Sequence, residues 1–179
     1  MTARLVIAPL DLNRSEELLN ALDALLRDAV ESGASVGFLP PLATEQSRAF
    51  WQETLDEVAA GTRLALGAWL DKQLVGTVHL ALATKANARH RGEVQKLLVH
   101  TTARRRGIAQ HLLDAIERAA LGSGRTLLVL DTEQGSDAER LYRRVGYSEV
   151  GVIPRFAATT VGPLTATVIF YKELEASNG

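Results

Sequence analysis

Residues 93–109 read Glu-Val-Gln-Lys-Leu-Leu-Val-His-Thr-Thr-Ala-Arg-Arg-Arg-Gly-Ile-Ala, and their hydrophobic period changes part-way along. Residues 94–99 form a short apolar run with a period of two, which predicts a β-strand. Beyond this run, apolar residues recur at helical spacing, at Ile108, Leu112, Leu113, Ile116 and Ala120. We therefore expect a strand, a turn and a helix, with three arginines and a glycine in the turn.

The turn carries groups that attract an anion. The first N–H groups of a helix lack partners within the helix and carry a partial positive charge, to which Arg104, Arg105 and Arg106 add full charges. Gly107 has no Cβ, so successive amides can approach a phosphate group closely and surround its oxygens. These features predict a di- or triphosphate site. The hexamer alone fits equally well a solvated helix start with an ordinary turn glycine.

Strands and helices are expected along the whole chain. The predicted strands cover residues 4–8, 63–70, 74–83, 94–99, 126–130, 147–153 and 166–174. The predicted helices run from Asn13 or Ser15 to Gly33, from Thr44 to Ala60, from Ile108 to about Gly122 and from Ser136 to Gly146. The strand-helix-strand order around 108–122 suits a parallel strand pair, and residues 154–163 are expected to form a loop.

Composition limits the possible functions. The chain has 179 residues, a net charge of −1, 23% charged and 46% hydrophobic residues, which argues against a nucleic-acid-binding protein with a broad basic face. It has no cysteine, so disulfides, thiolate zinc sites and acyl-cysteine intermediates are excluded. The four histidines do not have a zinc-site spacing, and we expect no metal. No apolar stretch approaches the ~20 residues of a membrane span, and we expect a cytoplasmic protein without a membrane partner.

Two separated motifs resemble those of the GNAT (GCN5-related) N-acetyltransferases. Arg104-x-x-Gly107-x-Ala109 is similar to the family's Arg/Gln-x-x-Gly-x-Gly/Ala signature, whose amides hold the pyrophosphate of acetyl-CoA. Downstream, the block Ala-x-x-Leu-Tyr-x-x-x-Gly-Tyr of residues 138–147 is similar to the family's Ala-x-x-Leu-Tyr-x-x-x-Gly-Phe. The two matches stand in the family's order and support one another.

The likeness is closest to acetyltransferases of the tabtoxin-resistance type and covers nearly the whole chain. It is carried by three segments: Gly33–Phe38, Glu93–Leu97 and Leu130–Glu133. Three positions depart from the family pattern. Arg105 stands where many members have Gly, Ala109 replaces the last Gly of the signature, and Gly135 occupies a place often held by Asn. The first two departures change the loop modestly, and the third removes a polar contact to the cofactor.

The resemblance implies an α/β GNAT acyl-CoA N-acyltransferase fold. In this fold a mixed, mostly antiparallel sheet contains a splayed parallel strand pair and is flanked by helices, and residues 1–179 would form a single acetyltransferase domain. The pantetheine arm of acetyl-CoA inserts beside a bulged strand and bonds its backbone. The family pattern therefore assigns cofactor binding to Leu97, Leu98, Val99, Arg104, Arg105, Arg106, Gly107, Ile108 and Ala109.

Acetylation of an amine requires a general base, because an ammonium has no lone pair with which to attack a thioester. Glu93 and Asp131, on the two strands expected to run parallel, could accept the proton directly or through water. Two close carboxylates also raise one another's pKa and attract a cationic acceptor. The spacing alone equally allows Glu93 to be a surface residue and Asp131 to bond the next loop.

A proton donor for the leaving thiolate is also suggested. The resemblance places Tyr142 near the coenzyme sulfur, where its hydroxyl could protonate the sulfur. Its spacing with Ala138, Leu141 and Val145 also fits an aromatic residue of the core. Both interpretations remain open at this stage.

The acceptor pocket is expected under the loop of residues 33–41. In the family this connection walls the pocket, so Ser35 and Phe38 are candidate contacts, although Val36 and Phe38 could instead simply pack the loop. Arg155 is a candidate partner for an acceptor carboxylate. The expected function is direct acetyl transfer from acetyl-CoA to a primary amine of a small amino-acid-like metabolite or antibiotic. The alternatives are a protein or peptide amine acetyltransferase and a non-catalytic CoA-binding sensor, and homodimers are common among the proteins it resembles.

Overall fold

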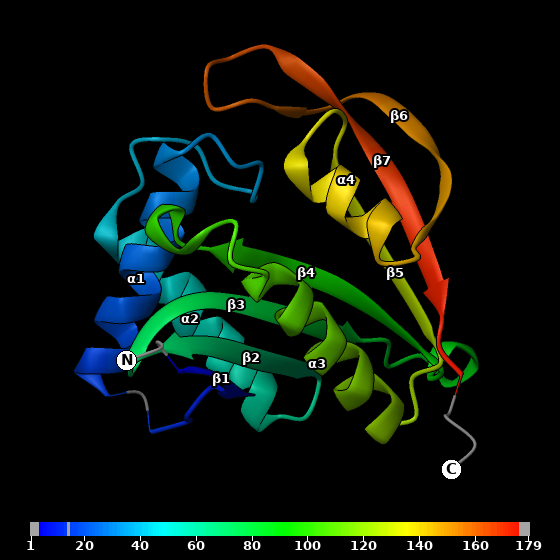
Figure 1. Ribbon diagram of the computed structural model, residues 1–179, viewed down its shortest axis with the longest axis horizontal. Helices are drawn as coiled ribbons and strands as arrows, with labels where there is room; N and C mark the ends of the chain where they lie inside the picture. Colours follow the sequence, from blue (N-terminus) through cyan, green and yellow to red (C-terminus); the bar gives the residue numbers. More distant parts are fainter. Residues whose placement is uncertain (1–3, 14, 176–179) are drawn as a thin grey trace.

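The computed structural model describes residues 4–13 and 15–175. Within them, seven strands form one sheet in the order β1-β2-β3-β4-β5-β7-β6 (Figure 1). The strands are β1 Leu5–Pro9, β2 Arg63–Leu70, β3 Gln73–Leu82, β4 Arg91–Val99, β5 Leu127–Glu133, β6 Ser148–Ala158 and β7 Leu164–Glu173. Neighbouring strands are antiparallel except β4 and β5, which run parallel. The predicted mixed, mostly antiparallel sheet is confirmed.

Helices connect the strands at the predicted places. Those in the described part of the chain are α1 Glu16–Glu31, α2 Thr44–Ala59, α3 Ile108–Gly122 and α4 Asp137–Arg144, with the short 3-10 helices η1 Ala86–Ala88 and η2 Thr101–Ala103. Ser15 caps α1 by accepting a hydrogen bond from the Leu18 amide at 3.2 Å. Ser136 caps α4 in the same way through the Glu139 amide at 3.1 Å. No helix of residues 4–13 and 15–175 is long and apolar enough to span a membrane.

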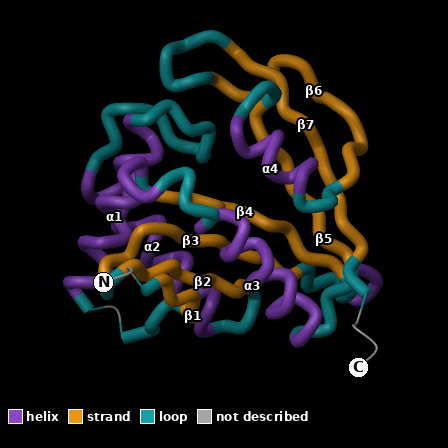
Figure 2. Tube along the Cα trace, in the orientation of Figure 1, coloured by secondary structure: helices purple, strands orange, loops and turns teal. Residues whose placement is uncertain are grey.

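The helices cover both faces of the sheet, because consecutive side chains of a strand point to opposite faces (Figure 2). On β2, Ala65 belongs to the hydrophobic cluster formed with α1 and α2, whereas Leu66 belongs to the cluster formed with α3 and α4. Trp51 and Leu55 of α2 are fully buried in the first cluster. The sheet is therefore a rigid middle layer on which the loops at its ends are held.

The parallel pair separates after three residues. β4 and β5 pair only from Arg91 with Leu127 to Glu93 with Val129, and beyond this point the strands diverge, as Figure 1 shows. The divergence accompanies a bulge in β4 around Lys96, whose φ is +50°. The backbone edge of β4 that faces β5 is thus left without a strand partner beyond Glu93, within the described residues.

The prediction of a loop over 154–163 was wrong. β6 continues through Pro154 to Ala158, and only residues 159–163 connect it to β7. β6 is the edge strand of the sheet, and its register with β7 is irregular between Ile153 and Ala157. An edge bulge tolerates a proline because no neighbour needs its missing N–H group. Arg155 lies in this bulge with φ +55°.

Candidate active site

A cleft of about 1030 Å³ lies where β4 and β5 separate. Its wall is formed by β4, the start of α3, the end of β5, α4 and the loop that follows α1. The sequence-predicted residues that line it are Ser35, Glu93, Leu97, Leu98, Val99, Arg104, Arg105, Gly107, Ile108, Ala109, Asp131 and Tyr142. Residues that are far apart in the chain are thus brought to one site.

Three predicted residues are not part of this wall. Arg106 and Arg155 are exposed and are not among the residues that line the cleft, although Phe156, next to Arg155, is. Phe38 borders a smaller neighbouring cavity of about 220 Å³ together with Ser35. Phe38 also packs edge-to-face on Phe50, with 5.3 Å between the ring centroids, so it holds the loop against α2.

The N-terminus of α3 opens into the cleft at the predicted phosphate turn. Gly107 occupies the cap position with φ +76°, and no side chain caps the helix. The first N–H groups of α3 are therefore free to bind an anion, and Ile108 and Ala109 line the cleft beside them. Arg105 also has a positive φ, +61°, which places two left-handed residues in one short turn. This turn has the chemistry that a pyrophosphate requires.

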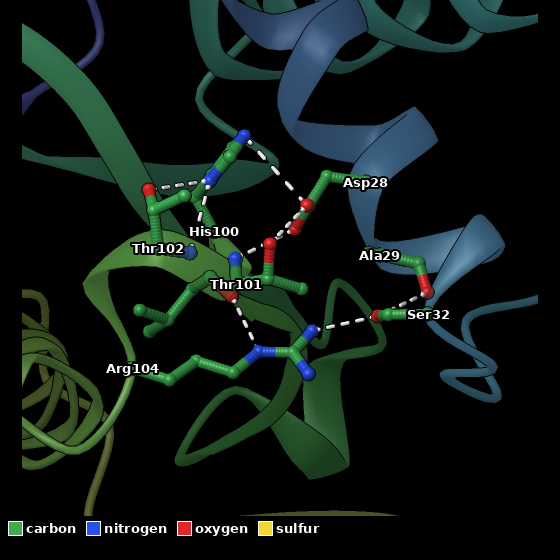
Figure 3. A network of polar contacts seen from close by, with 8 residues as sticks. Asp28, Ala29, Ser32, His100, Thr101, Thr102 and Arg104 are labelled. Carbon is green, nitrogen blue, oxygen red and sulfur yellow. Dashed lines mark hydrogen bonds and ion pairs between the residues drawn. The ribbon is translucent and has the colours of Figure 1, made fainter.

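A polar network that the sequence did not reveal fastens this turn to the end of α1 (Figure 3). The Asp28 carboxylate accepts hydrogen bonds from the backbone N–H and the hydroxyl of Thr101, at 2.8 and 2.6 Å. The Arg104 guanidinium donates to the Val99 carbonyl at 3.1 Å and to the Ser32 hydroxyl at 2.7 Å. The phosphate turn and the C-terminal end of α1, which leads into the 33–41 loop, consequently form one connected unit.

The two candidate general bases stand on opposite sides of the split. Glu93 is the last residue of β4 that pairs with β5. Its partner is Val129, and Asp131 lies two residues further along β5. The Gln95 side-chain amide donates to Glu93 at 2.8 Å, and the Arg63 guanidinium donates to the Gln95 oxygen at 2.9 Å. The orientation of Glu93 is therefore set by Gln95, which Arg63 holds in turn.

Asp131 is positioned from the other side of the cleft. The Thr167 hydroxyl lies 2.7 Å from the Asp131 carboxylate and 2.9 Å from the Thr132 carbonyl, so it can donate to either oxygen. Thr167 is buried on β7, the strand that pairs with β5 on both sides of Asp131. Both carboxylates are exposed to the cleft, where an amine could reach them.

Tyr142 is packed in the core and also forms part of the cleft wall. Its ring is buried beside Tyr147, at 5.5 Å between centroids, and beside Phe170, at 6.2 Å, yet the residue lines the cleft. Burial, with a smaller contribution from the Asp131 charge, raises the pKa of Tyr142. The hydroxyl therefore stays protonated at neutral pH, as a proton donor must.

Sequence reasoning missed Lys96, which lines the same cleft. Burial lowers the pKa of Lys96 and the Arg63 charge lowers it further, while the carboxylates of Asp131 and Glu93 raise it. In a regular strand, successive side chains point to opposite faces of the sheet, but the bulge in β4 breaks this alternation at Lys96. No local sequence signal marks that bulge.

Residues 21–147 match the model of a protein family described as the acetyltransferase (GNAT) family. This chain belongs to that family. GNAT acetyltransferases take their acetyl group from acetyl-CoA, and the same holds for this enzyme. The uncapped α3 and the unpaired edge of β4 fit the phosphates and the amide-rich arm of that molecule.

Solved structures confirm the GNAT fold. An N-acetyltransferase from Staphylococcus aureus Mu50 is 17% identical, with a TM-score of 0.80 over 96% of this chain and 99% of that chain. A ribosomal-protein-alanine N-acetyltransferase from Brucella melitensis is 24% identical, with a TM-score of 0.78 over 94% and 99%. The protein yncA from Salmonella typhimurium, solved with its cofactor acetyl-CoA, is 16% identical, with a TM-score of 0.77 over 98% and 96%.

Proposed function

We propose that this acetyltransferase transfers the acetyl group directly to a primary amine of a small, amino-acid-like metabolite or antibiotic. The observation that carries the proposal is the position of Glu93 and Asp131 on the two separating strands, in the cleft that also receives the N-terminus of α3. Donor and acceptor would bind together. The chain has no cysteine to carry an acyl group between them, which supports direct transfer.

In the proposed mechanism, Glu93 or Asp131 accepts a proton from the acceptor ammonium, directly or through water. The free amine then attacks the thioester carbonyl, so that a C–N bond forms and the C–S bond breaks. Tyr142 donates its proton to the departing sulfur and regains one from the new amide nitrogen, which loses its second proton as the product forms. Burial raises the pKa of Tyr142, so its hydroxyl carries a proton before the sulfur departs. The backbone of Leu97, Leu98 and Val99 would bond the pantetheine arm, and residues 104–109 would bind the phosphates.

The small size of the acceptor is supported by the loop after α1. Residues 33–37 line the cleft, and we assign the acceptor to the end of the cleft that they border. This loop is also one of the segments that resemble acetyltransferases of the tabtoxin-resistance type, which we propose as the nearest subgroup. A peptide acceptor, as the name of the Brucella melitensis protein implies for that protein, would need this end to admit an extended chain.

The test is acetyl-CoA consumption, read as free thiol release, against a panel of amino acids, polyamines, aminoglycosides and short peptides. Thiol release with amino acids or another small-molecule class supports the proposal. Release with peptides only would assign the enzyme to peptide amines. Coenzyme binding without thiol release across the panel would favour a non-catalytic CoA-binding sensor.

Replacing Ser35 by Ala should alter the KM of the acceptor but not the affinity for acetyl-CoA.

A further inference from the structure

Lys96 owes its position to the β4 bulge. From Gln95 to Leu98 the strand takes three steps, whereas the facing strand takes two from His79 to Thr77, so β4 holds one extra residue. Lys96 adopts φ +50°, which a residue with a Cβ keeps only where its surroundings fix it. The Thr77 hydroxyl donates to the Lys96 carbonyl at 3.1 Å and fixes the bulge. The side chain is thereby directed to the cleft wall.

The ammonium group of Lys96 lies under the loop that bounds the acceptor end. Its Nζ is 5.4 Å from the ring centroid of Phe50 and 6.0 Å from that of Phe38. It is also 3.7 Å from the point where a Cβ on Gly37 would lie. The two rings favour a cation at this place, because their faces carry partial negative charge.

This ammonium group has three N–H donors. Within residues 4–13 and 15–175, no hydrogen bond or ion pair reaches Nζ of Lys96. Glu93 and Asp131 act on it through space only. Lys96 is half-buried and borders the cleft, so an anionic group of a ligand can compensate for the water that its ammonium group has lost.

The charges around Lys96 restrict which anion fits. Glu93 and Asp131 share the cleft and would repel a dianion such as a phosphate, while the arginines of the phosphate turn provide a separate site for such a group. A single carboxylate carries half the charge of a dianion, so these two residues repel it less, and its charge matches that of one lysine. The same two carboxylates attract an ammonium. A small zwitterion could therefore place its carboxylate at Lys96 and its ammonium near Glu93 and Asp131.

We propose that Lys96 binds the carboxylate of the acceptor and thereby selects acceptors that carry an amine and a carboxylate on one small molecule. The proposal rests on the proposed function, because it names the acceptor chemistry of the same cleft. It also replaces Arg155 as the residue that recognises the acceptor carboxylate. Lys96 is a specificity-determining residue in this account and does not exchange a proton with the reacting amine.

The experiment compares each amino acid with its own carboxamide at saturating acetyl-CoA. The wild-type enzyme should prefer the acid by about 10- to 100-fold in kcat/KM, the range of one charge-assisted hydrogen bond. Lys96→Met keeps the unbranched stem against Phe38 and Phe50 but removes the charge. It should bring the ratio of acid to amide to about 1, mainly through the acceptor KM, whereas Lys96→Arg should retain a preference for the acid.

Two controls keep the outcomes distinct. Lys85→Met changes an exposed lysine outside the cleft and should keep the wild-type ratio. Acetyl-CoA affinity shows whether the Lys96→Met variant has kept its fold. If it has not, the proposal is judged from the acid-to-amide ratios of the wild-type enzyme and of Lys96→Arg. A wild-type ratio near 1, or an unchanged ratio in a folded Lys96→Met, overturns the proposal while leaving the proposed function intact. Absence of thiol release with every amine refutes the proposed function itself and this inference with it.

Discussion

Replacing Asp28 by alanine should weaken both the fold and the acetyl-CoA site. Asp28 lies in the last turn of α1, where the helix dipole disfavours a carboxylate. Its side chain is nevertheless 15% exposed and accepts both hydrogen bonds from Thr101. The residue therefore joins α1 to the turn ahead of α3 at a cost to its own helix.

The size of the effect follows from these contacts. Two charge-assisted hydrogen bonds at the lower end of their range contribute about 3 kcal/mol. Alanine recovers about 0.5 kcal/mol of helix propensity and about 0.5 kcal/mol of the unfavourable dipole interaction. The net loss is about 2 kcal/mol, which lowers Tm by about 4–8 °C in a chain of this size. The KM for acetyl-CoA should rise about 3- to 10-fold, because Thr101, at the start of the phosphate turn, loses its anchor on α1.

Thermal unfolding followed by circular dichroism, together with steady-state kinetics, tests this prediction. Asp114→Ala is the matched control, because Asp114 is an exposed residue of α3, and its Tm should change little. Thr101→Val should show part of the Asp28→Ala effect, since it keeps the backbone N–H donor. An Asp28→Ala variant with the wild-type Tm and the wild-type KM for acetyl-CoA would refute the reasoning.

Three further predictions follow from buried or hydrogen-bonded groups. Gly76→Ala should lose about 1–3 kcal/mol in denaturant unfolding, because its Cβ would lie 2.8 Å from the Leu98 carbonyl oxygen, whereas Gly122→Ala, with open space around it, should not. Burial and nearby positive charges lower the pKa of His79 to about 3. Below about pH 6.5 His79 therefore binds a proton in the unfolded chain but not in the folded chain. The free energy of unfolding is highest above pH 6.5 and falls by up to about 1.4 kcal/mol per pH unit towards pH 3. His79→Leu should flatten that fall between pH 6 and 4, and parallel curves would contradict the assignment. Gln95→Leu should lower kcat about 10-fold with an unchanged KM for acetyl-CoA, because Glu93 loses the amide that orients it; equal kcat values would show that the orientation is immaterial.

Local patterns were sufficient where the structure depends on neighbouring residues. The change of period at residues 93–109 predicted the strand, turn and helix that the structure contains. Ser136 caps α4 as predicted, and of the two candidates for α1, Asn13 and Ser15, the cap is Ser15. The sequence Ser-x-x-Glu of residues 136–139 is typical of a capping box, but Glu139 accepts a hydrogen bond from the amide of Gly135, at 2.5 Å, instead of from that of Ser136. Caps and periods are short-range properties, which is why a sequence reports them.

Long-range and irregular features were beyond the sequence pattern. The hydrogen bond between Asp28 and Thr101 joins residues 73 positions apart, and no sequence pattern near either residue predicts it. Lys96 was missed because one inserted residue in β4 rotates its side chain away from the strand alternation. Pro154 was taken as the start of a loop because the position of its strand at the edge of the sheet is a tertiary property.

In the proposed mechanism, Glu93 and Asp131 serve the chemical step, and the cleft binds acetyl-CoA without them. The most direct test is to measure acetyl-CoA affinity by calorimetry and thiol release with the best acceptor, in the wild-type enzyme and in the double variant Glu93→Gln, Asp131→Asn. The account predicts an affinity within about 2-fold and a turnover lower by about 100-fold or more, the usual contribution of a general base. Undiminished turnover in a folded double variant would contradict it.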